Sequence, residues 1–175
     1  MGIILGIDIG GSTTKIVRLD REGAVSAMLR VRAEDQLTSL FGALGNFLTT
    51  NRLALGDVER VVLTGVGASY VNGDIYGLPT RRVSEFNASG TGALALSGQP
   101  EGVVVTMGTG TAFLWASGGK VEHLCGSGIG GGTMGGLCRK LVGMERFGQI
   151  RELARQGDLN KVDLTIKDIS QNPAA

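Results

Sequence analysis

Apolar and polar residues alternate along the first part of the chain in a pattern typical of β-strands. An apolar run at residues 3–9 is followed by β-branched residues at 14–19 and by an alternating stretch at 24–32. A glycine pair at 10–11 and a polar turn ending at Gly23 separate the three stretches. This order predicts a three-stranded antiparallel meander.

Beyond the meander the hydrophobic period changes to that of a helix. Apolar residues recur three and four positions apart over residues 34–50, which predicts an amphipathic helix. A buried strand at 60–64 is expected next, parallel to the first strand through a crossover connection. The pattern then predicts a short strand at 81–84 and a helix at 85–97.

The same order of elements starts again in the second half. A buried run at 103–107, a Gly/Thr turn and a strand at 112–117 are followed by a hairpin turn at Gly118 and Gly119 and a strand at 120–125. A glycine-rich stretch and two helical segments come after these strands. The repeated order indicates a weak internal duplication.

The duplication predicts an α/β protein with two domains. We place the first domain at residues 1–100 and the start of the second at 101–175, with the boundary near residues 98–102. The chain ends soon after residue 164, so the second domain is expected to be incomplete, without its last strand and helix.

Composition narrows the possible function classes. Hydrophobic residues make up 42% of the chain and charged residues 19%, which is typical of a globular protein. The net charge of +1 argues against a nucleic-acid-binding protein. The first nine residues lack a basic segment and a cleavage site, so we expect a buried strand there and no signal peptide. No apolar stretch is long enough to span a membrane. We therefore expect a cytoplasmic protein without a nucleic-acid or membrane partner. The unusual feature is the presence of 30 glycines.

The first glycine motif follows the strand predicted at 3–9. Its members are Asp8, Ile9, Gly10, Gly11, Ser12, Thr13, Thr14 and Lys15. Two adjacent glycines let backbone N–H groups approach a phosphate, and hydroxyl groups and a lysine add donors and positive charge. Asp8 can hold Mg²⁺, a hard cation that prefers carboxylate and phosphate oxygens. The alternative is a plain β-hairpin with a charged strand end.

Two further glycine motifs follow strands in the second half. Thr109 lies in the segment Met107–Thr111, which can form a second phosphate loop or a simple hairpin turn. Seven of the eleven residues from Gly126 to Gly136 are glycine, and a helix is predicted to begin near Thr133. Unpaired N–H groups and the helix dipole favour an anion at such a helix start. A flexible loop is the alternative for this third motif.

The segments GIDIGGSTTKIV, VVTMGTGTAF and GSGIGGGTMGGL, in this order, resemble the acetate and sugar kinase/Hsp70/actin superfamily. Within it they are similar to type II pantothenate kinases, and the later segment GDLNKVDLTIKDI also resembles that family. The resemblance covers nearly all of the chain, and the third motif distinguishes this family from sugar kinases. It implies ribonuclease-H-like (actin-like ATPase) domains.

The resemblance also implies a reaction. Type II pantothenate kinases transfer the γ-phosphate of ATP to the terminal hydroxyl of pantothenate, the first step of coenzyme A synthesis, with ATP and Mg²⁺ as cofactors. The resemblance implies that Glu85, just before the predicted helix and between the first and second glycine motifs, is the general base. A carboxylate suits this role, because it can accept the proton of an alcohol nucleophile. The alternative for Glu85 is an acidic residue favoured by the dipole at a helix start. Besides residues 8–15, the resemblance implies ATP contacts for Thr109, Gly131, Gly132, Thr133, Met134, Gly135 and Phe147. For Phe147, an apolar core position is an equal interpretation.

One position departs from the family pattern. His123 stands where the family has an arginine that binds pantothenate, so it is the implied substrate residue. An arginine fork binds a carboxylate with two hydrogen bonds, whereas a neutral histidine does not. The alternative for His123 is a solvent-facing strand residue. The family also implies a homodimer formed through helices of the second half.

Two other functions remain open at this point. One is a non-catalytic nucleotide-binding remnant that lacks the rest of the second domain. The other is an ATPase that activates 2-hydroxyacyl-CoA dehydratases, since related activators hold an iron–sulfur cluster between subunits through cysteines of the second half. Cys125 and Cys138 are the cysteines available here, and small buried thiols are the alternative for them.

Overall fold

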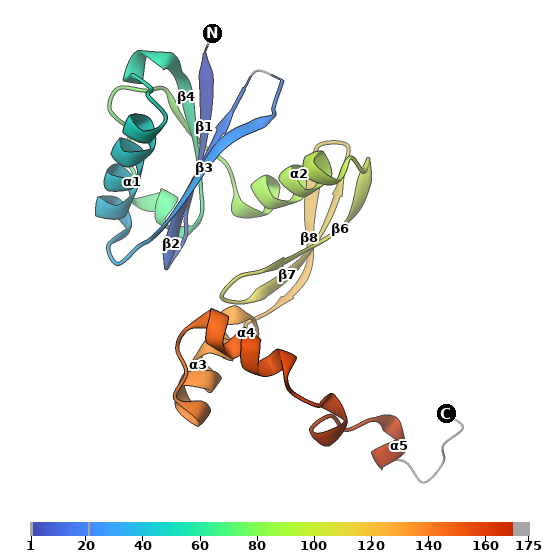
Figure 1. Ribbon diagram of the computed structural model, residues 1–175. Helices are drawn as coiled ribbons and strands as arrows, with labels where there is room; N and C mark the ends of the chain where they lie inside the picture. Colours follow the sequence, from blue (N-terminus) through green and yellow to red (C-terminus); the bar gives the residue numbers. More distant parts are fainter. Residues whose placement is uncertain (1, 21, 170–175) are drawn as a thin grey trace. The chain divides into compact units, whose positions relative to one another are not determined.

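The computed structural model describes residues 2–20 and 22–169, which form two compact units (Figure 1). One unit comprises the chain up to Val104 together with Leu114–Leu124. The other comprises Val105–Phe113 together with residues 125–169. The domain boundary near residues 98–102 remains a prediction, because strands of the second half contribute residues to both units.

The first half forms a five-stranded sheet in the order β3-β2-β1-β4-β5. Its strands are β1 (Ile3–Ile9), β2 (Thr13–Leu19), β3 (Val25–Arg32), β4 (Val58–Thr64) and β5 (Thr80–Arg82). β1 pairs antiparallel with β2, and β2 with β3, so the predicted meander is confirmed. β1 pairs parallel with β4, and β4 with β5, which confirms the predicted crossover.

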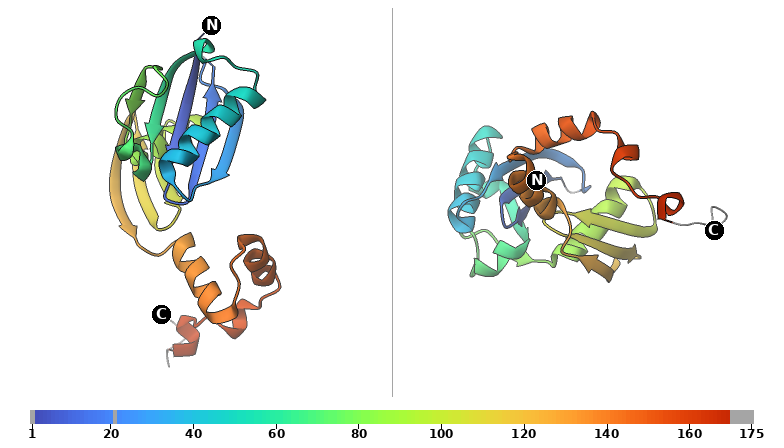
Figure 2. Two further views of the ribbon diagram at one scale, coloured as in Figure 1. Left: turned by 90° about the vertical axis from the view of Figure 1, so that its left-hand side faces the viewer. Right: turned by 90° about the horizontal axis from the view of Figure 1, so that it is seen from below.

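Helix α1 (Gln36–Thr50) connects the meander to β4 and lies across one face of the sheet (Figure 2). Asp35 is its N-cap, where the carboxylate accepts a hydrogen bond of 2.7 Å from the amide of Thr38. Every second residue of β1 faces this helix and is buried, as strand alternation requires. The largest fully buried side chains of this core are Leu5, Ile7, Ile9, Ile16, Leu40, Leu44, Phe47, Val61, Leu63 and Ile75.

Two short 3₁₀ helices, η1 (Leu55–Asp57) and η2 (Val66–Tyr70), flank β4. Helix α2 (Glu85–Ser97) follows β5 and has the predicted bounds. Gly90, which weakens the helix pattern in sequence, has a packing role: a Cβ there would lie 2.6 Å from a methyl group of Val121. This glycine therefore allows α2 to approach strand β8 closely.

The second half begins with a three-stranded sheet in the order β6-β7-β8. Its strands are β6 (Glu101–Met107), β7 (Thr111–Ser117) and β8 (Lys120–Ser127). The turns between consecutive strands are two and three residues long, and connections this short join antiparallel neighbours. The predicted strands are confirmed, although β8 continues two residues past the predicted end at Cys125.

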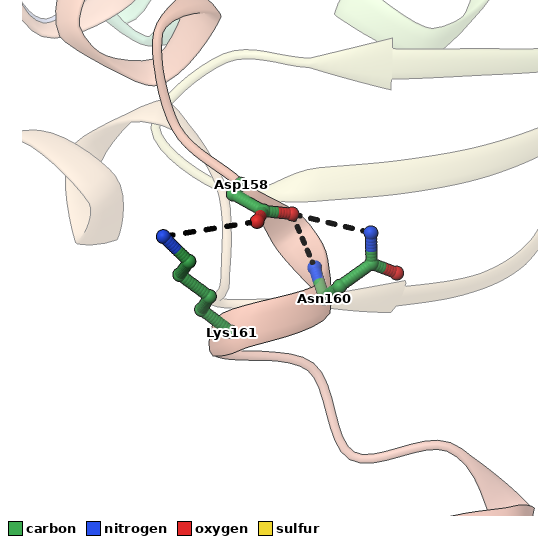
Figure 3. Close-up of polar contacts among 3 residues, drawn as sticks. All are labelled: Asp158, Asn160 and Lys161. Carbon is green, nitrogen blue, oxygen red and sulfur yellow. Dashed lines mark hydrogen bonds and ion pairs between the residues drawn. The ribbon is translucent and has the colours of Figure 1, made fainter.

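Helices complete the described chain: α3 (Gly131–Val142), α4 (Phe147–Arg155), η3 (Leu159–Lys161) and α5 (Ile166–Ile169). α3 begins two residues before the predicted start at Thr133. Asp158 caps η3 by accepting hydrogen bonds from the backbone and side-chain amides of Asn160, at 3.1 and 3.2 Å, and lies 4.0 Å from Lys161 Nζ (Figure 3). None of the helices described here is both long and apolar enough to cross a membrane.

Candidate functional site

The β1–β2 hairpin brings Asp8 and Lys15 together. The two residues are direct partners in the antiparallel ladder, and Lys15 Nζ lies 2.5 Å from Asp8 Oδ2. The Gly10 amide donates a 3.0 Å hydrogen bond to the Thr13 carbonyl, which closes the turn. Gly11 and Ser12 at the tip are exposed. The sequence-predicted carboxylate and cation are therefore adjacent, beside an open turn.

Not every residue of this motif can use its side chain. Ile9 and Thr14 are fully buried, on the sheet face that α1 covers. Asp8 and Lys15 lie on the opposite face, since neighbouring residues of a strand alternate. Any contact between a ligand and Ile9 or Thr14 in this structure is therefore limited to their main chain.

Asp8 also contacts the end of β4, which sequence reasoning missed. Thr64 is its partner in the parallel ladder, and the buried Thr64 Oγ1 has no hydrogen-bond partner among the described residues. Gly65 follows with φ of +87°, and a Cβ at this position would clash with Asp8 Oδ1 and with the Ile9 carbonyl. A glycine directly after a predicted buried strand was the available signal, but only the strand order shows that it faces Asp8.

Glu85 lies at the same end of the sheet as Asp8. Val83 continues β5 and donates a 2.9 Å hydrogen bond to the Leu63 carbonyl of β4. Ser84 then caps α2 by accepting a hydrogen bond from the Asn87 amide, and Glu85 is the exposed first residue of the helix. Because β1, β4 and β5 are parallel, their carboxyl ends meet at one edge. In open α/β sheets, ligands bind at such an edge.

Strand spacing gives the scale of this edge. β1 and β5 are separated by β4, so their ends lie about 10 Å apart. Asp8 follows from one of these strands and Glu85 from the other. A spacing of this order between the two strand ends is comparable to the size of a small molecule.

His123 contacts the residue next to Glu85. Its imidazole ring stacks on the ring of Phe86, with centroids 4.8 Å apart and an angle of 10° between the planes. Both rings remain partly accessible, because His123 is exposed and Phe86 is 40% exposed. The predicted base and the predicted substrate residue are therefore linked through Phe86, an aromatic residue that sequence reasoning did not select.

The second and third glycine motifs pack against each other. The amide of Gly131 donates a 2.8 Å hydrogen bond to the Gly108 carbonyl, and the amide of Gly132 donates a 3.2 Å bond to the Thr109 carbonyl. A Cβ on Gly130 would lie 2.7 Å from the carbonyl groups of Thr109 and Gly110. Glycine is required here because two stretches of main chain are in direct contact.

These contacts correct one expectation. The sequence predicted unpaired N–H groups at the start of α3, but the amides of Gly131 and Gly132 are already paired. Within the described part of the chain, the Thr133 amide has no hydrogen-bond acceptor, and the Thr133 hydroxyl donates to the Gly128 carbonyl. An anion at this helix start would therefore meet fewer free donors than the glycine count suggests.

The remaining residues of this group are more open. Met134 is 38% exposed, Gly135 has no neighbouring atom where a Cβ would lie, and Thr109 is exposed. Phe147 is 62% exposed at the start of α4, so it is not a core residue of its unit. A hollow of about 460 Å³ between the end of α3 and α4 contains none of the predicted site residues.

Asp8 is the predicted metal ligand. No group of three or more His, Cys, Asp or Glu side chains suited to a metal ion occurs in the residues that the structure describes. The single carboxylate of Asp8 fits Mg²⁺, which keeps several water ligands and often takes only one or two carboxylates. Cys125 is exposed and Cys138 is half-buried, and both are free thiols.

Comparisons with known proteins agree with the resemblance seen in the sequence. Residues 101–174 match the family model described as Fumble. The type II pantothenate kinase of Staphylococcus epidermidis is 28% identical over 170 residues, which cover 94% of this chain and 59% of that protein. The chain therefore spans less than two thirds of the curated relatives that it matches over most of its length. These matches confirm the similarity to type II pantothenate kinases.

Solved structures show the fold. Component A of (R)-2-hydroxyglutaryl-CoA dehydratase from Acidaminococcus fermentans superposes with a TM-score of 0.68 at 16% identity, covering 94% of this chain and 61% of that one. The activator of 2-hydroxyisocaproyl-CoA dehydratase from Clostridium difficile, with bound ADPNP, superposes with a TM-score of 0.66 at 18% identity, covering 93% of this chain and 58% of that one. The predicted α/β fold class of the actin-like ATPases is confirmed.

Proposed function

We propose that this chain is part of an ATP-dependent kinase that phosphorylates the terminal hydroxyl of pantothenate. The observation that carries the proposal is the common sheet edge, where Asp8 follows β1 and Glu85 follows β5. The similarity to type II pantothenate kinases over 94% of the chain supports the choice of substrate.

Asp8, Lys15 and Glu85 would each have a different role in the reaction. Asp8 would hold Mg²⁺, which when bound neutralises charge on the phosphates of ATP. Lys15 and the exposed turn of the hairpin would bind phosphate oxygens. Glu85 would orient the acceptor hydroxyl and accept its proton as the oxygen attacks the γ-phosphate. Helix α2 places this carboxylate at an exposed helix start, where an approaching substrate can reach it.

The other predicted contacts complete the proposal. His123, beside Phe86, would contact the acceptor. The main chain of residues 9–14 and the loop at Thr109 would contact ATP, as would the start of α3 from Gly131 to Gly135 and the exposed Phe147. A homodimer and a cytoplasmic location remain predictions.

A coupled ADP-release assay, run with and without pantothenate, tests the function. The Glu85→Gln variant keeps the size of the side chain but cannot accept the proton, so we expect turnover to fall about 10²–10⁴-fold while ATP affinity is unchanged. Glu152→Ala is the matched control, since it removes an exposed carboxylate from α4. Pantothenate-independent turnover, or full activity of the Glu85 variant, would contradict the proposal.

A dehydratase activator is the second candidate. The dehydratase component A and the dehydratase activator share the fold, which at their low identity says nothing about function. The free thiols of Cys125 and Cys138 are the observation in its favour. An iron assay of anaerobically purified protein, together with its visible absorption spectrum, separates this candidate from the kinase.

A further inference from the structure

A row of charged residues crosses the end of the five-stranded sheet. Lys15 on β2 is the ladder partner of Asp8 on β1 and, on its other side, of Arg30 on β3. Arg32 is the partner of Thr13, two residues further along the same strands. Figure 1 shows these three strands side by side. Because ladder partners project from the same side of a sheet, all four charged residues share one face.

This face differs from the one that α1 covers. Ile9, Thr14 and Ile16, which alternate with the charged positions, are buried in the core. By contrast, Lys15, Arg30 and Arg32 are exposed. The alternation of β3 thus presents two arginines, two positions apart, on the open side of the sheet.

The charges on this face are not balanced. Lys15 is paired with Asp8, so the two largely neutralise each other. The guanidinium groups of Arg30 and Arg32 have no hydrogen-bond or ion-pair partner among residues 2–20 and 22–169. Three cations and one carboxylate leave an excess of positive charge beside the hairpin that follows β1.

We infer that Arg30 and Arg32 extend the phosphate site from the β1–β2 hairpin onto β3, where they bind the triphosphate group of the nucleotide. This inference rests on the proposed function. Neighbouring strands lie about 4.8 Å apart, so the backbone of Arg30 on β3 lies about 10 Å from that of Asp8 on β1. The long arginine side chain can span part of this distance, so one extended triphosphate can contact both residues. The guanidinium group binds phosphate oxygens in pairs, and the excess charge matches the negative charge that ATP retains with Mg²⁺.

The chain contains a matched control on the same face. Arg60 is the ladder partner of Ile4, four residues before Asp8 on β1, so it lies about 13 Å from the charged row along the strands. It also has a partner, since its guanidinium lies 3.4 Å from Glu59. Arg60→Ala therefore removes one arginine from the same face without touching the proposed site.

Isothermal titration of the purified chain with ATP and Mg²⁺ tests the inference. We expect the Arg30→Ala/Arg32→Ala variant to raise the Kd by about tenfold or more, with a smaller effect at high salt because exposed charges are screened. Arg60→Ala should leave the Kd unchanged, and Arg30→Lys/Arg32→Lys should recover part of the affinity. The double variant should also bind inorganic tripolyphosphate more weakly, by a factor similar to that for ATP. Its affinity for adenosine should equal that of the wild type.

The outcomes separate this inference from the proposed function. A double variant that keeps its melting temperature and binds ATP like the wild type overturns the inference and leaves the kinase proposal standing. Loss of adenosine binding as well would indicate a structural role for the arginines and would also overturn it. If the wild type binds neither ATP nor tripolyphosphate, the nucleotide step of the proposed function fails and the inference fails with it.

Discussion

The imidazole ring of His123 and the phenyl ring of Phe86 form a nearly parallel stack, with 4.8 Å between centroids. Phe86 directly follows Glu85 in the first turn of α2, and His123 lies on β8. The stack therefore attaches the start of the helix, and with it the proposed base, to the strand. Gly90 and Val121 add a second close contact between the same two elements.

Substitutions of His123 separate packing from substrate recognition. His123→Phe keeps an aromatic ring on Phe86, so we expect an unchanged melting temperature but a higher KM for pantothenate. His123→Ala also loses the stack, which is worth about 0.5–1.5 kcal/mol. His123→Arg supplies a fork for a carboxylate and should lower the KM. If all three variants keep the wild-type KM, His123 does not contact the acceptor.

Gly65 should be intolerant of a side chain because of its neighbours. Gly65→Ala places a methyl group against Asp8 Oδ1 and the Ile9 carbonyl, and adds the cost of an alanine in a positive-φ, extended-ψ conformation that only glycine adopts readily, about 1–3 kcal/mol. Gly73→Ala is the matched control, since Gly73 has φ of +81° but open space where the methyl group would lie. Urea unfolding should show a greater loss of stability for Gly65→Ala, together with weaker binding of ATP and Mg²⁺. Equal losses in the two variants would argue against the clash.

The contact between the second and third glycine motifs predicts opposite effects at two glycines. Gly130→Ala forces apart the loops at Gly110 and Gly130, and we expect about 1–3 kcal/mol of destabilisation. Gly136→Ala lies in the open interior of α3 and should stabilise by about 0.5–1 kcal/mol. Thermal unfolding followed by circular dichroism measures both changes. A neutral Gly130→Ala variant would show that the loops separate in solution.

Asp35 predicts a stability change at acidic pH. Hydrogen bonds from the side chain and the amide of Thr38 lower the pKa of Asp35 from its ordinary value of 3.8. The stabilising contribution is therefore fully present above pH 3.8 and is lost as the pH falls through the lower folded pKa. Asp35→Asn keeps an N-cap acceptor but does not titrate.

The melting temperature of the wild type should therefore fall relative to Asp35→Asn as the pH is lowered below 3.8. The pKa of Asp168 is also lowered, by hydrogen bonds from Thr165, but this group is present in both proteins and cancels in the comparison. A constant difference between the two proteins from pH 6 down to pH 2 would contradict the assignment.

Local pattern predicted the elements well because each depends on neighbours in the sequence. The alternation of Ile3, Leu5 and Ile7 requires a strand with one buried face, and Ser84 before Glu85 marks a helix start. The candidate residues Asp8, Lys15 and Glu85 could be selected in the same way, from residue type and position at the end of an element. The roles proposed for these three residues rest on their residue type and position and on the family resemblance.

The sequence by itself determined the strands, the helices and the positions of the three glycine motifs, since periodicity and glycine pairs act over short distances. Only the tertiary structure decided which groups are available for chemistry. It buried Thr14, paired the amides of Gly131 and Gly132, and aligned Arg30 with Lys15. The physical reason is that burial and hydrogen-bond pairing depend on strand order and register, which join residues far apart in the chain.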